Sequence, residues 1–177
     1  AECLGTFSAN LMHPSQGVFE TDGFVPIRDI DVITGAYTSS ADGWPGEGEF
    51  QAFYYYYDDS RDENIYKADN RVGLSDSENV QISTYGAHWV QAYPMSDGVT
   101  FDTVTWGALQ GGSWGLQDHL ALAFALEGGV RFNDAWSKPW LRAGWNWSSG
   151  DDDATDSDHG TFFQLLPEAR RYAKNPF

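Results

Sequence analysis

Residues 118–148 constrain the fold more than any other stretch, because their hydrophobic side chains recur at every second position. A period of two is the period of a β-strand, whose side chains point alternately to its two faces. Residues 118–133 therefore predict a strand with one hydrophobic face, formed by Leu120, Leu122, Phe124, Leu126, Val130 and Phe132. Small or charged side chains form the other face, namely His119, Ala121, Ala123, Ala125, Glu127 and Arg131.

Residues 138–148 repeat this pattern after a polar break. The hydrophobic face consists of Pro139, Leu141, Ala143, Trp145 and Trp147. The opposite face consists of Trp140, Arg142, Gly144 and Asn146. Each segment thus presents a hydrophobic face with aromatic ends and a face that is small or charged.

The length of the alternation distinguishes two classes of β-protein. Strands of soluble β-sandwiches also alternate, but they usually run for about 5–6 residues. A strand that crosses an outer membrane needs about 9–11 residues, with aromatic side chains at the two interfaces. Both segments fit the second class, and we expect a set of their side chains to face lipid: Leu120, Leu122, Phe124, Leu126, Leu141 and Trp145.

Composition agrees with a single β-barrel-type domain over residues 1–177. Aromatic residues make up 16% of the chain, whereas the mean hydropathy is only −0.46. Outer-membrane barrels combine these two properties because only every second strand residue meets lipid. No run of 18 apolar residues occurs, which excludes a transmembrane helix. The net charge of −16 argues against nucleic acid as a partner, since phosphates require Lys and Arg.

The remaining chain predicts more strands, joined as neighbouring antiparallel hairpins in an all-β meander. The expected strands cover 28–38, 46–58, 79–93, 99–110, 118–132 and 138–148. Thr6–Met12 could add a short strand, and Phe19–Pro26 could add an extended piece. Within 79–94 we expect an outward face of Val80, Ile82, Thr84, Gly86 and Val90. Residues 58–79 and 149–160 are expected to be long acidic loops.

The end of the chain carries residues that point to a known family. The relevant runs are 138–153 (KPWLRAGWNWSSGDDD) and 156–163 (DSDHGTFF), followed by Leu166 and Pro167. They resemble the alginate-export family of bacterial outer-membrane porins, whose members carry a Pro-x-Leu-x-Ala-Gly-aromatic strand, a Ser-Gly-Asp-acidic loop and a Gly-Thr-Phe closing segment. The resemblance is clearest over 138–167 and looser over 50–137.

This resemblance implies a transmembrane β-barrel in the outer membrane of a Gram-negative bacterium, and no enzyme. Family barrels have roughly eighteen strands, and at about 20 residues per strand such a barrel needs more residues than this chain contains. The length therefore indicates a fragment or a short relative. The exporter that gives the family its name has a basic lumen, whereas this chain is acidic overall. We therefore expect passive diffusion of a polar or anionic saccharide of the uronate class, without assigning alginate itself. Outer-membrane lipid and lipopolysaccharide are the expected surroundings.

Charges on the non-lipid face predict the residues that line the lumen, because a charge on the lipid side is too costly. These residues are Arg131, Arg142, Glu127, His119 and Asn146. Two interpretations remain open. The arginines could select anionic solutes through their guanidinium groups. Alternatively, Arg131, Arg142 and Glu127 could pair with neighbouring groups and brace the barrel.

The second acidic loop could also bind an ion. Asp151, Asp152, Asp153, Asp156 and Asp158 offer carboxylate oxygens within one short segment, as Ca²⁺ requires. Their spacing is not that of an EF-hand, and acidic exposed loops are more often simply solvated. No other cofactor is expected, since the four histidines and the single Cys3 lack ligand spacing.

Two other functions fit the same pattern. A structural β-protein of the cell envelope, as a homo-oligomer or in a larger complex, would form ordered assemblies without conducting ions. A soluble acidic carbohydrate-binding β-sandwich would stay in the aqueous phase on detergent partition.

Overall fold

A computed structural model describes residues 5–13, 30–40, 46–60, 78–153 and 156–164. The strands are β1 (Thr6–Met12), β2 (Ile30–Ser40), β3 (Glu47–Asp59), β4 (Val80–Ser96), β5 (Val99–Trp114), β6 (Gln117–Phe132), β7 (Trp140–Ser148) and β8 (Asp158–His159). None of the described segments forms a helix with the length and apolarity needed to cross a membrane.

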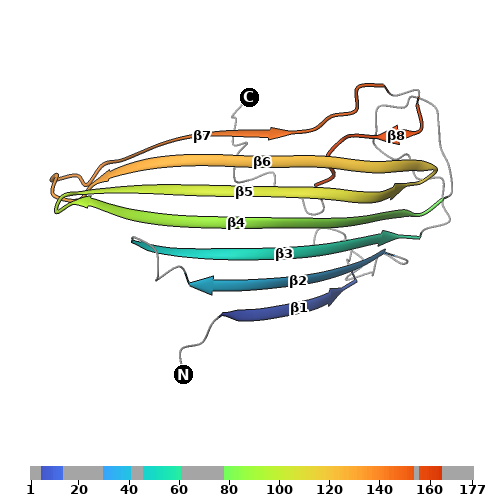
Figure 1. Ribbon diagram of the computed structural model, residues 1–177, viewed down its shortest axis with the longest axis horizontal. Coiled ribbons are helices and arrows are strands. Elements are labelled where there is room, and N and C mark those ends of the chain that lie inside the picture. Colours follow the sequence, from blue (N-terminus) through green and yellow to red (C-terminus); the bar gives the residue numbers. More distant parts are fainter. Residues whose placement is uncertain (1–4, 14–29, 41–45, 61–77, 154–155, 165–177) are drawn as a thin grey trace, which may run out of the picture.

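The strands β1 to β7 lie side by side in chain order, each antiparallel to the next (Figure 1). The short β8 lies off this path and pairs in parallel with the start of β6, through Asp118–Asp158 and His119–His159. Within the described ranges β1 and β7 each pair with one strand, so this sheet is open, like a segment of a barrel wall. The predicted all-β meander of neighbouring hairpins is confirmed.

The observed strand bounds follow the predicted ones closely, and Thr6–Met12 is a strand as expected. Phe19–Pro26 and most of the predicted loop 58–79 lie outside the described residues. The largest difference is in β5, which continues past residue 110 to Trp114. The glycines at 111 and 112 pair with Leu120 and His119 instead of forming a turn. A side chain at Gly112 would collide with the Gln81 carbonyl, so glycine marks a close backbone approach here.

The sheet has two chemically different faces. We call the inner face the one that carries a hollow of about 1090 Å³, which extends from Met12 in β1 to Asn146 in β7. The other is the outer face. Directly opposed residues of antiparallel strands share a face, so the register assigns every strand residue to one of the two.

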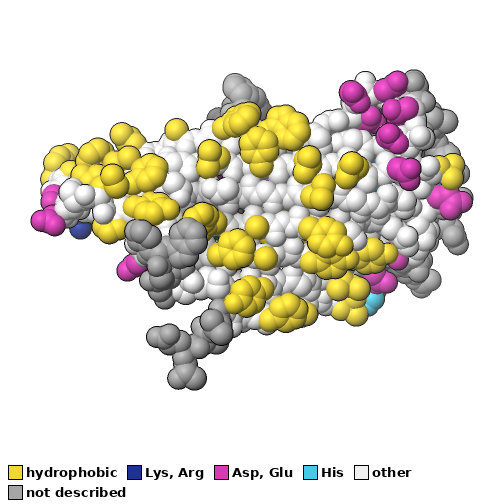
Figure 2. All heavy atoms as spheres, in the orientation of Figure 1, with side chains coloured by type: hydrophobic (Ala, Val, Ile, Leu, Met, Phe, Trp, Pro, Cys, Tyr) yellow, Lys and Arg dark blue, Asp and Glu magenta, His cyan; other side chains and the backbone are white. Residues whose placement is uncertain are grey.

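Large exposed hydrophobic side chains cover the outer face, as Figure 2 shows for the face turned to the viewer. They include Phe7, Leu11, Ile33, Phe50, Tyr85, Leu109, Leu120, Leu122, Leu126, Leu141, Trp145 and Trp147. Phe124 lies among them and meets Trp145 edge to face, with ring centroids 5.1 Å apart. All six residues expected to face lipid thus lie on one face. An exposed apolar surface of this extent is rare on a soluble protein.

Polar side chains line much of the inner face and bond to one another across strands. The Gln51 amide donates to Thr38 Oγ1 at 3.0 Å, and the Gln110 amide donates to Thr84 Oγ1 at 3.1 Å. Ala121 and Ala123 of β6 are buried on this face. Small residues there leave room above the wall.

The face assignment predicted for residues 79–94 is wrong. Val80, Ile82, Thr84, Gly86 and Val90 lie opposite inner-face residues of β5, and Ile82 is fully buried. Hydrophobic side chains face inward here because the chain covers them. Val80, Ile82 and Trp114 form a buried cluster, against which Tyr57 and Phe163 pack.

Candidate functional site

Charged side chains of three strands meet on the inner face near the β6–β7 turn. Asp102 of β5 lies opposite Gly129 of β6, and Gly129 lies opposite Arg142 of β7. Because Gly129 has no side chain, the residues on either side of it can meet above the β6 backbone. A Cβ at position 129 would lie 2.6 Å from Asp102 Oδ2. The glycine is therefore a condition for the cluster.

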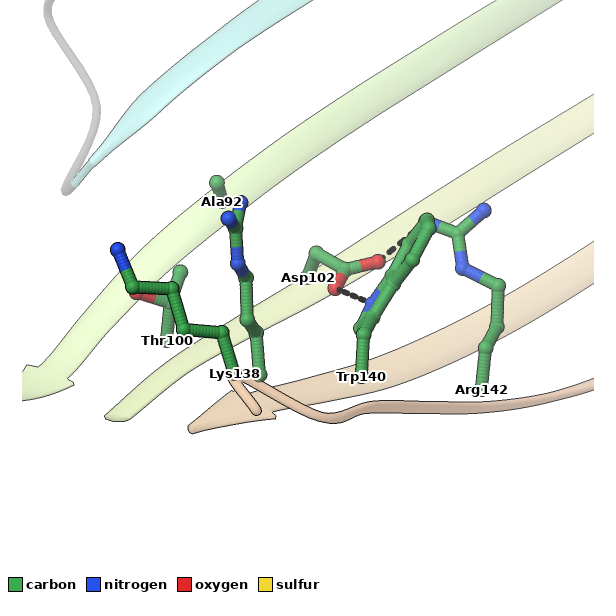
Figure 3. Close-up of a pocket in the computed structure, with 7 residues that line it drawn as sticks. Ala92, Thr100, Asp102, Lys138, Trp140 and Arg142 are labelled. Carbon is green, nitrogen blue, oxygen red and sulfur yellow. Dashed lines mark hydrogen bonds and ion pairs between the residues drawn. The ribbon is translucent and has the colours of Figure 1, made fainter. Parts of the chain in front are cut away.

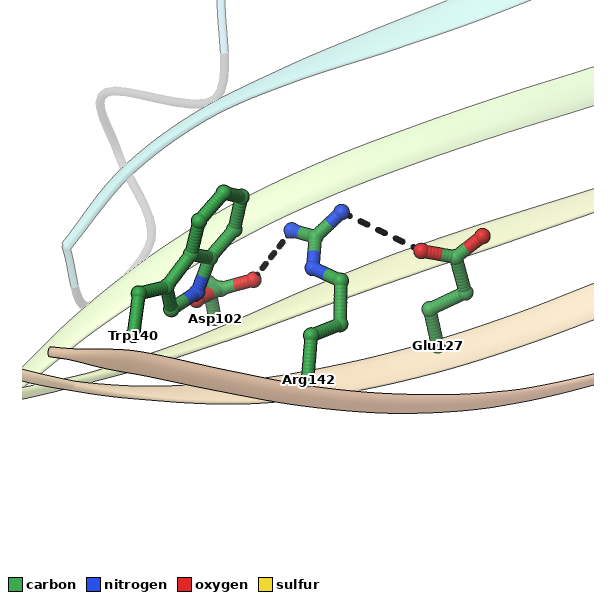
Figure 4. Close-up of polar contacts among 4 residues, drawn as sticks. All are labelled: Asp102, Glu127, Trp140 and Arg142. Carbon is green, nitrogen blue, oxygen red and sulfur yellow. Dashed lines mark hydrogen bonds and ion pairs between the residues drawn. The ribbon is translucent and has the colours of Figure 1, made fainter. Parts of the chain in front are cut away.

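Arg142 is the centre of this cluster and is held by two carboxylates (Figure 4). Its Nη2 donates to Asp102 Oδ1, and its Nη1 donates to Glu127 Oε2 at 3.1 Å. The Trp140 indole N–H donates to the other Asp102 oxygen at 2.8 Å. The guanidinium carbon also lies 4.4 Å from the Trp140 ring centroid, within the range of a cation–π contact. We call Asp102, Glu127, Trp140 and Arg142 the braced cluster.

A pocket of about 490 Å³ adjoins the braced cluster, and Figure 3 shows the side chains that line it. The lining residues are Ala92, Thr100, Asp102, Arg131, Lys138, Trp140 and Arg142. Lys138, Trp140 and Arg142 rise on the same side of the sheet. Among the described residues, neither Arg131 nor Lys138 has an ion-pair partner. The pocket therefore contains two positive charges beside an indole ring.

The backbone at Lys138 is unusual for a residue with a side chain. Its φ of 44° lies in the left-handed region, and it precedes Pro139. A left-handed conformation costs a non-glycine residue roughly 1–2 kcal/mol. The protein thus keeps a lysine at a position where glycine would be unstrained, which is a pattern found at binding sites.

The predicted lumen residues occupy four places on the inner face. Arg142 and Glu127 meet in the braced cluster, and Arg131 lines the adjoining pocket. Asn146 lines the larger hollow further along β7. His119 lies near the opposite end of β6 with only 3% of its surface exposed. Its Nδ1 is 2.8 Å from His159 Nδ1, which requires one nitrogen to donate and the other to accept.

Sequence reasoning missed Asp102, Lys138 and the pairing role of Trp140. The two faces of residues 99–110 could not be told apart by hydrophobicity, so Asp102 received no role. A usable signal was present, because Asp102 is the single charged residue of β5. A lone carboxylate in a long strand of such a sheet must avoid the hydrophobic face.

Residues 158–164 form a second structure on the inner face, at the end of the sheet opposite the braced cluster. The Gln117 amide donates to the Asp158 carbonyl at 2.9 Å, and the Gln110 amide bonds to the backbone of Phe163. The His159 ring stacks on Trp114 at 4.5 Å. This segment, which we call the inner segment, therefore covers the apolar part of the wall. Nothing in the local sequence predicted its direction.

Residues 5–176 match the family described as alginate export. The chain belongs to the alginate export family. The match confirms the resemblance found over 138–167 and extends it to almost the whole chain. No curated protein and no solved structure matches the chain. The family comprises outer-membrane β-barrel proteins that transport polysaccharide, not enzymes.

The acidic loop of this alginate export family member uses two of its carboxylates to bind its own backbone. Asp151 Oδ1 accepts from the Asp153 N–H at 3.3 Å, and Asp156 Oδ1 accepts from the Asp158 N–H at 2.9 Å. In the described part of the chain, no three His, Cys, Asp or Glu side chains are grouped as metal ligands. Calcium binding by Asp151, Asp152, Asp153, Asp156 and Asp158 remains a prediction.

Proposed function

We propose that this chain forms part of the wall of an outer-membrane pore. The pore would pass polar or anionic saccharides of the uronate class by passive diffusion. The observation that carries the proposal is the pair of cations, Arg131 and Lys138, beside Trp140 on the inner face. Carboxylated sugars offer a group that both cations can bind and a ring that can lie near the indole. The family supports transport across the outer membrane.

The two faces of the sheet suit the two environments that a pore wall meets. Leu120, Leu122, Leu126, Leu141 and Trp145 are each about half or more exposed on the outer face, where lipid would cover them. Acyl chains of outer-membrane lipid or of lipopolysaccharide would cover this surface. The inner face, with its hollow and its charges, would meet water and solute.

Arg142 and the two other cations have different roles in this proposal. Arg142 is committed to Asp102 and Glu127, so the three charges together are negative and attract no anion. Its role is to brace β5, β6 and β7. Arg131 and Lys138 have no such partners in the described residues, and their donors remain available for carboxylates. Selectivity therefore rests on Arg131 and Lys138.

The experiment compares solute entry into proteoliposomes that contain the purified protein. A trisaccharide of galacturonate and a neutral trisaccharide of equal length are supplied separately, and the ratio of their rates is measured. The double variant Arg131→Gln/Lys138→Gln should lower this ratio roughly tenfold, as expected for losing charged hydrogen bonds. Entry of the neutral sugar is the internal control, because a damaged barrel would change both rates.

An unchanged ratio in the double variant would remove Arg131 and Lys138 from the selectivity of the pore. Entry of neither sugar through a closed barrel that conducts ions would contradict saccharide transport, and ordered assemblies that conduct no ions would favour a structural envelope protein. The variant Trp145→Leu on the outer face is a second control and should leave the ratio as it was.

A further inference from the structure

We propose that the inner face carries a second saccharide subsite, an aromatic platform that binds the faces of pyranose rings without regard to their charge. The platform consists of Phe53 and Tyr55 of β3, Trp106 of β5 and Phe162 of the inner segment. It lies in the larger hollow, apart from the pocket of Arg131 and Lys138. The inference rests on the proposed function, because it needs a saccharide inside the barrel.

The four rings form one continuous surface. Phe53 and Trp106 stack with an interplanar angle of 19° and centroids 6.2 Å apart. Tyr55 adjoins Phe53 at 5.1 Å, and Phe162 meets Trp106 edge to face at 6.1 Å. Three segments that are far apart in the sequence contribute these rings, so the surface exists only in the folded wall.

Burial distinguishes the platform from the apolar cluster at the end of the sheet. Trp114 in that cluster is 8% exposed and lies beneath the inner segment. Trp106, Tyr55 and Phe162 are only half-buried and line the hollow. Phe53 is buried and supports Trp106 from the side. Three rings thus present apolar surface to an open space, where no core residue covers them within the described part of the chain.

Polar side chains surround this apolar surface in the way that a sugar requires. Gln51 and His88, which are only partly buried, line the same hollow. Their amide and imidazole groups supply both donors and acceptors, and neither carries a fixed charge. A pyranose ring has C–H groups on its faces and hydroxyl groups around its edge. An aromatic surface with a neutral polar border matches both parts.

The size of the hollow fits an oligosaccharide better than a single small molecule. Its volume of about 1090 Å³ lies just above the roughly 300–1,000 Å³ that is usual for ligand pockets. The hollow extends across the wall from β1 to β7, whereas the platform occupies its middle strands. Some sugar rings of an oligosaccharide could lie on the platform while another sugar unit of the same molecule reaches Arg131 and Lys138.

The test uses calorimetric titration of the detergent-folded full chain with two probes, neutral cellohexaose and hexagalacturonate. Both probes should bind the unmodified protein. Trp106→Leu keeps an apolar side chain but removes the flat ring, and it should weaken cellohexaose binding roughly tenfold. Phe162→Leu should weaken it as well, and this residue lies outside the strands, so its replacement does not endanger the sheet. Trp145→Leu is the matched control on the outer face and should not change binding.

Each outcome decides the proposal. Cellohexaose binding that weakens in both platform variants and not in Trp145→Leu supports it. Absence of cellohexaose binding overturns it, and so does an equal effect of all three variants. If hexagalacturonate binds while cellohexaose does not, the charged pocket and the proposed pore remain and the platform alone is wrong. The Arg131→Gln/Lys138→Gln variant separates the subsites further, since it should weaken hexagalacturonate and leave cellohexaose unaffected.

Discussion

Gln110 binds the backbone of Phe163 through both the nitrogen and the oxygen of its side-chain amide, although the two residues lie 53 positions apart in the sequence. Its Nε2 donates to the Phe163 carbonyl at 2.7 Å, and its Oε1 accepts from the Phe163 N–H at 2.8 Å. Gln110 is fully buried, so these bonds do not compete with water. This contact attaches the inner segment to the wall and thereby holds Phe162 at the platform.

Replacing Gln110 with Leu should release the inner segment. The change leaves the N–H and the carbonyl of Phe163 without partners, at a cost of about 1–3 kcal/mol in the local free energy of opening. Hydrogen exchange of the backbone amides of residues 158–163 should accelerate accordingly, while exchange in β4 and β5 changes little. Limited proteolysis should cut the variant first within this segment.

Gln81→Leu is the matched control for this measurement. The side chain of Gln81 lies on the outer face of β4 and bonds to Asp58 at 3.3 Å, so the sheet separates it from the inner segment. It should leave the exchange of residues 158–163 unaltered. Equal exchange in the Gln110 variant and in the unmodified protein would show that the ring contacts of Phe163, not the amide, hold the segment.

The strands could be predicted from sequence because their period of two is local and long. Register then follows from short turns, so that Glu127 and Arg142 could be placed on one face. The inward direction of Val80 and Ile82 could not be predicted, because it depends on Phe163, which covers them from a distant part of the chain. The contact between Asp102 and Arg142 could not be predicted either. Asp102 meets Arg142 across an intervening strand at Gly129, and no spacing within one segment encodes such a contact.

The variant Leu122→Arg tests which face of the sheet meets lipid. Leu122 lies on the outer face of β6, half exposed. Leu122→Arg should lower the free energy of unfolding in bilayers by about 2–4 kcal/mol if the residue lies near the midplane. Asn146→Arg, on the inner face of β7, places the same charge against water and should cost much less. Equal costs for the two variants in a urea titration would contradict the face assignment.

Calcium should have no effect on stability. Asp151 and Asp156 already accept backbone N–H groups, and the described carboxylates form no group of three ligands. Weak attraction of cations to a bare acidic loop is screened by salt. We therefore expect equal thermal midpoints in chelator and in millimolar Ca²⁺ at physiological ionic strength. A saturable rise of the midpoint that disappears in Asp152→Asn/Asp153→Asn would instead establish a site.

The pairing of Asp102 with Arg142 should be strong enough to measure in a double-mutant cycle. Arg142 has 31% of its side chain exposed and Asp102 has 15%, so solvent screens the pair only in part. Removing Arg142 leaves Asp102 and Glu127 without their shared cation, whereas removing Asp102 leaves Arg142 bonded to Glu127. Arg142→Ala should therefore destabilise the protein more than Asp102→Ala, and the coupling energy should be about 1–3 kcal/mol.

A distant pair supplies the control for this cycle. Gln51 lies in β3, four strand spacings or about 19 Å from β7, so Gln51→Ala and Arg142→Ala should add within about 0.5 kcal/mol. High salt should reduce the cost of Arg142→Ala, because the repulsion that it exposes between Asp102 and Glu127 is then screened. If Arg142→Ala leaves stability unchanged yet alters the galacturonate rate, Arg142 is a solute-binding residue and the brace assigned to it is wrong.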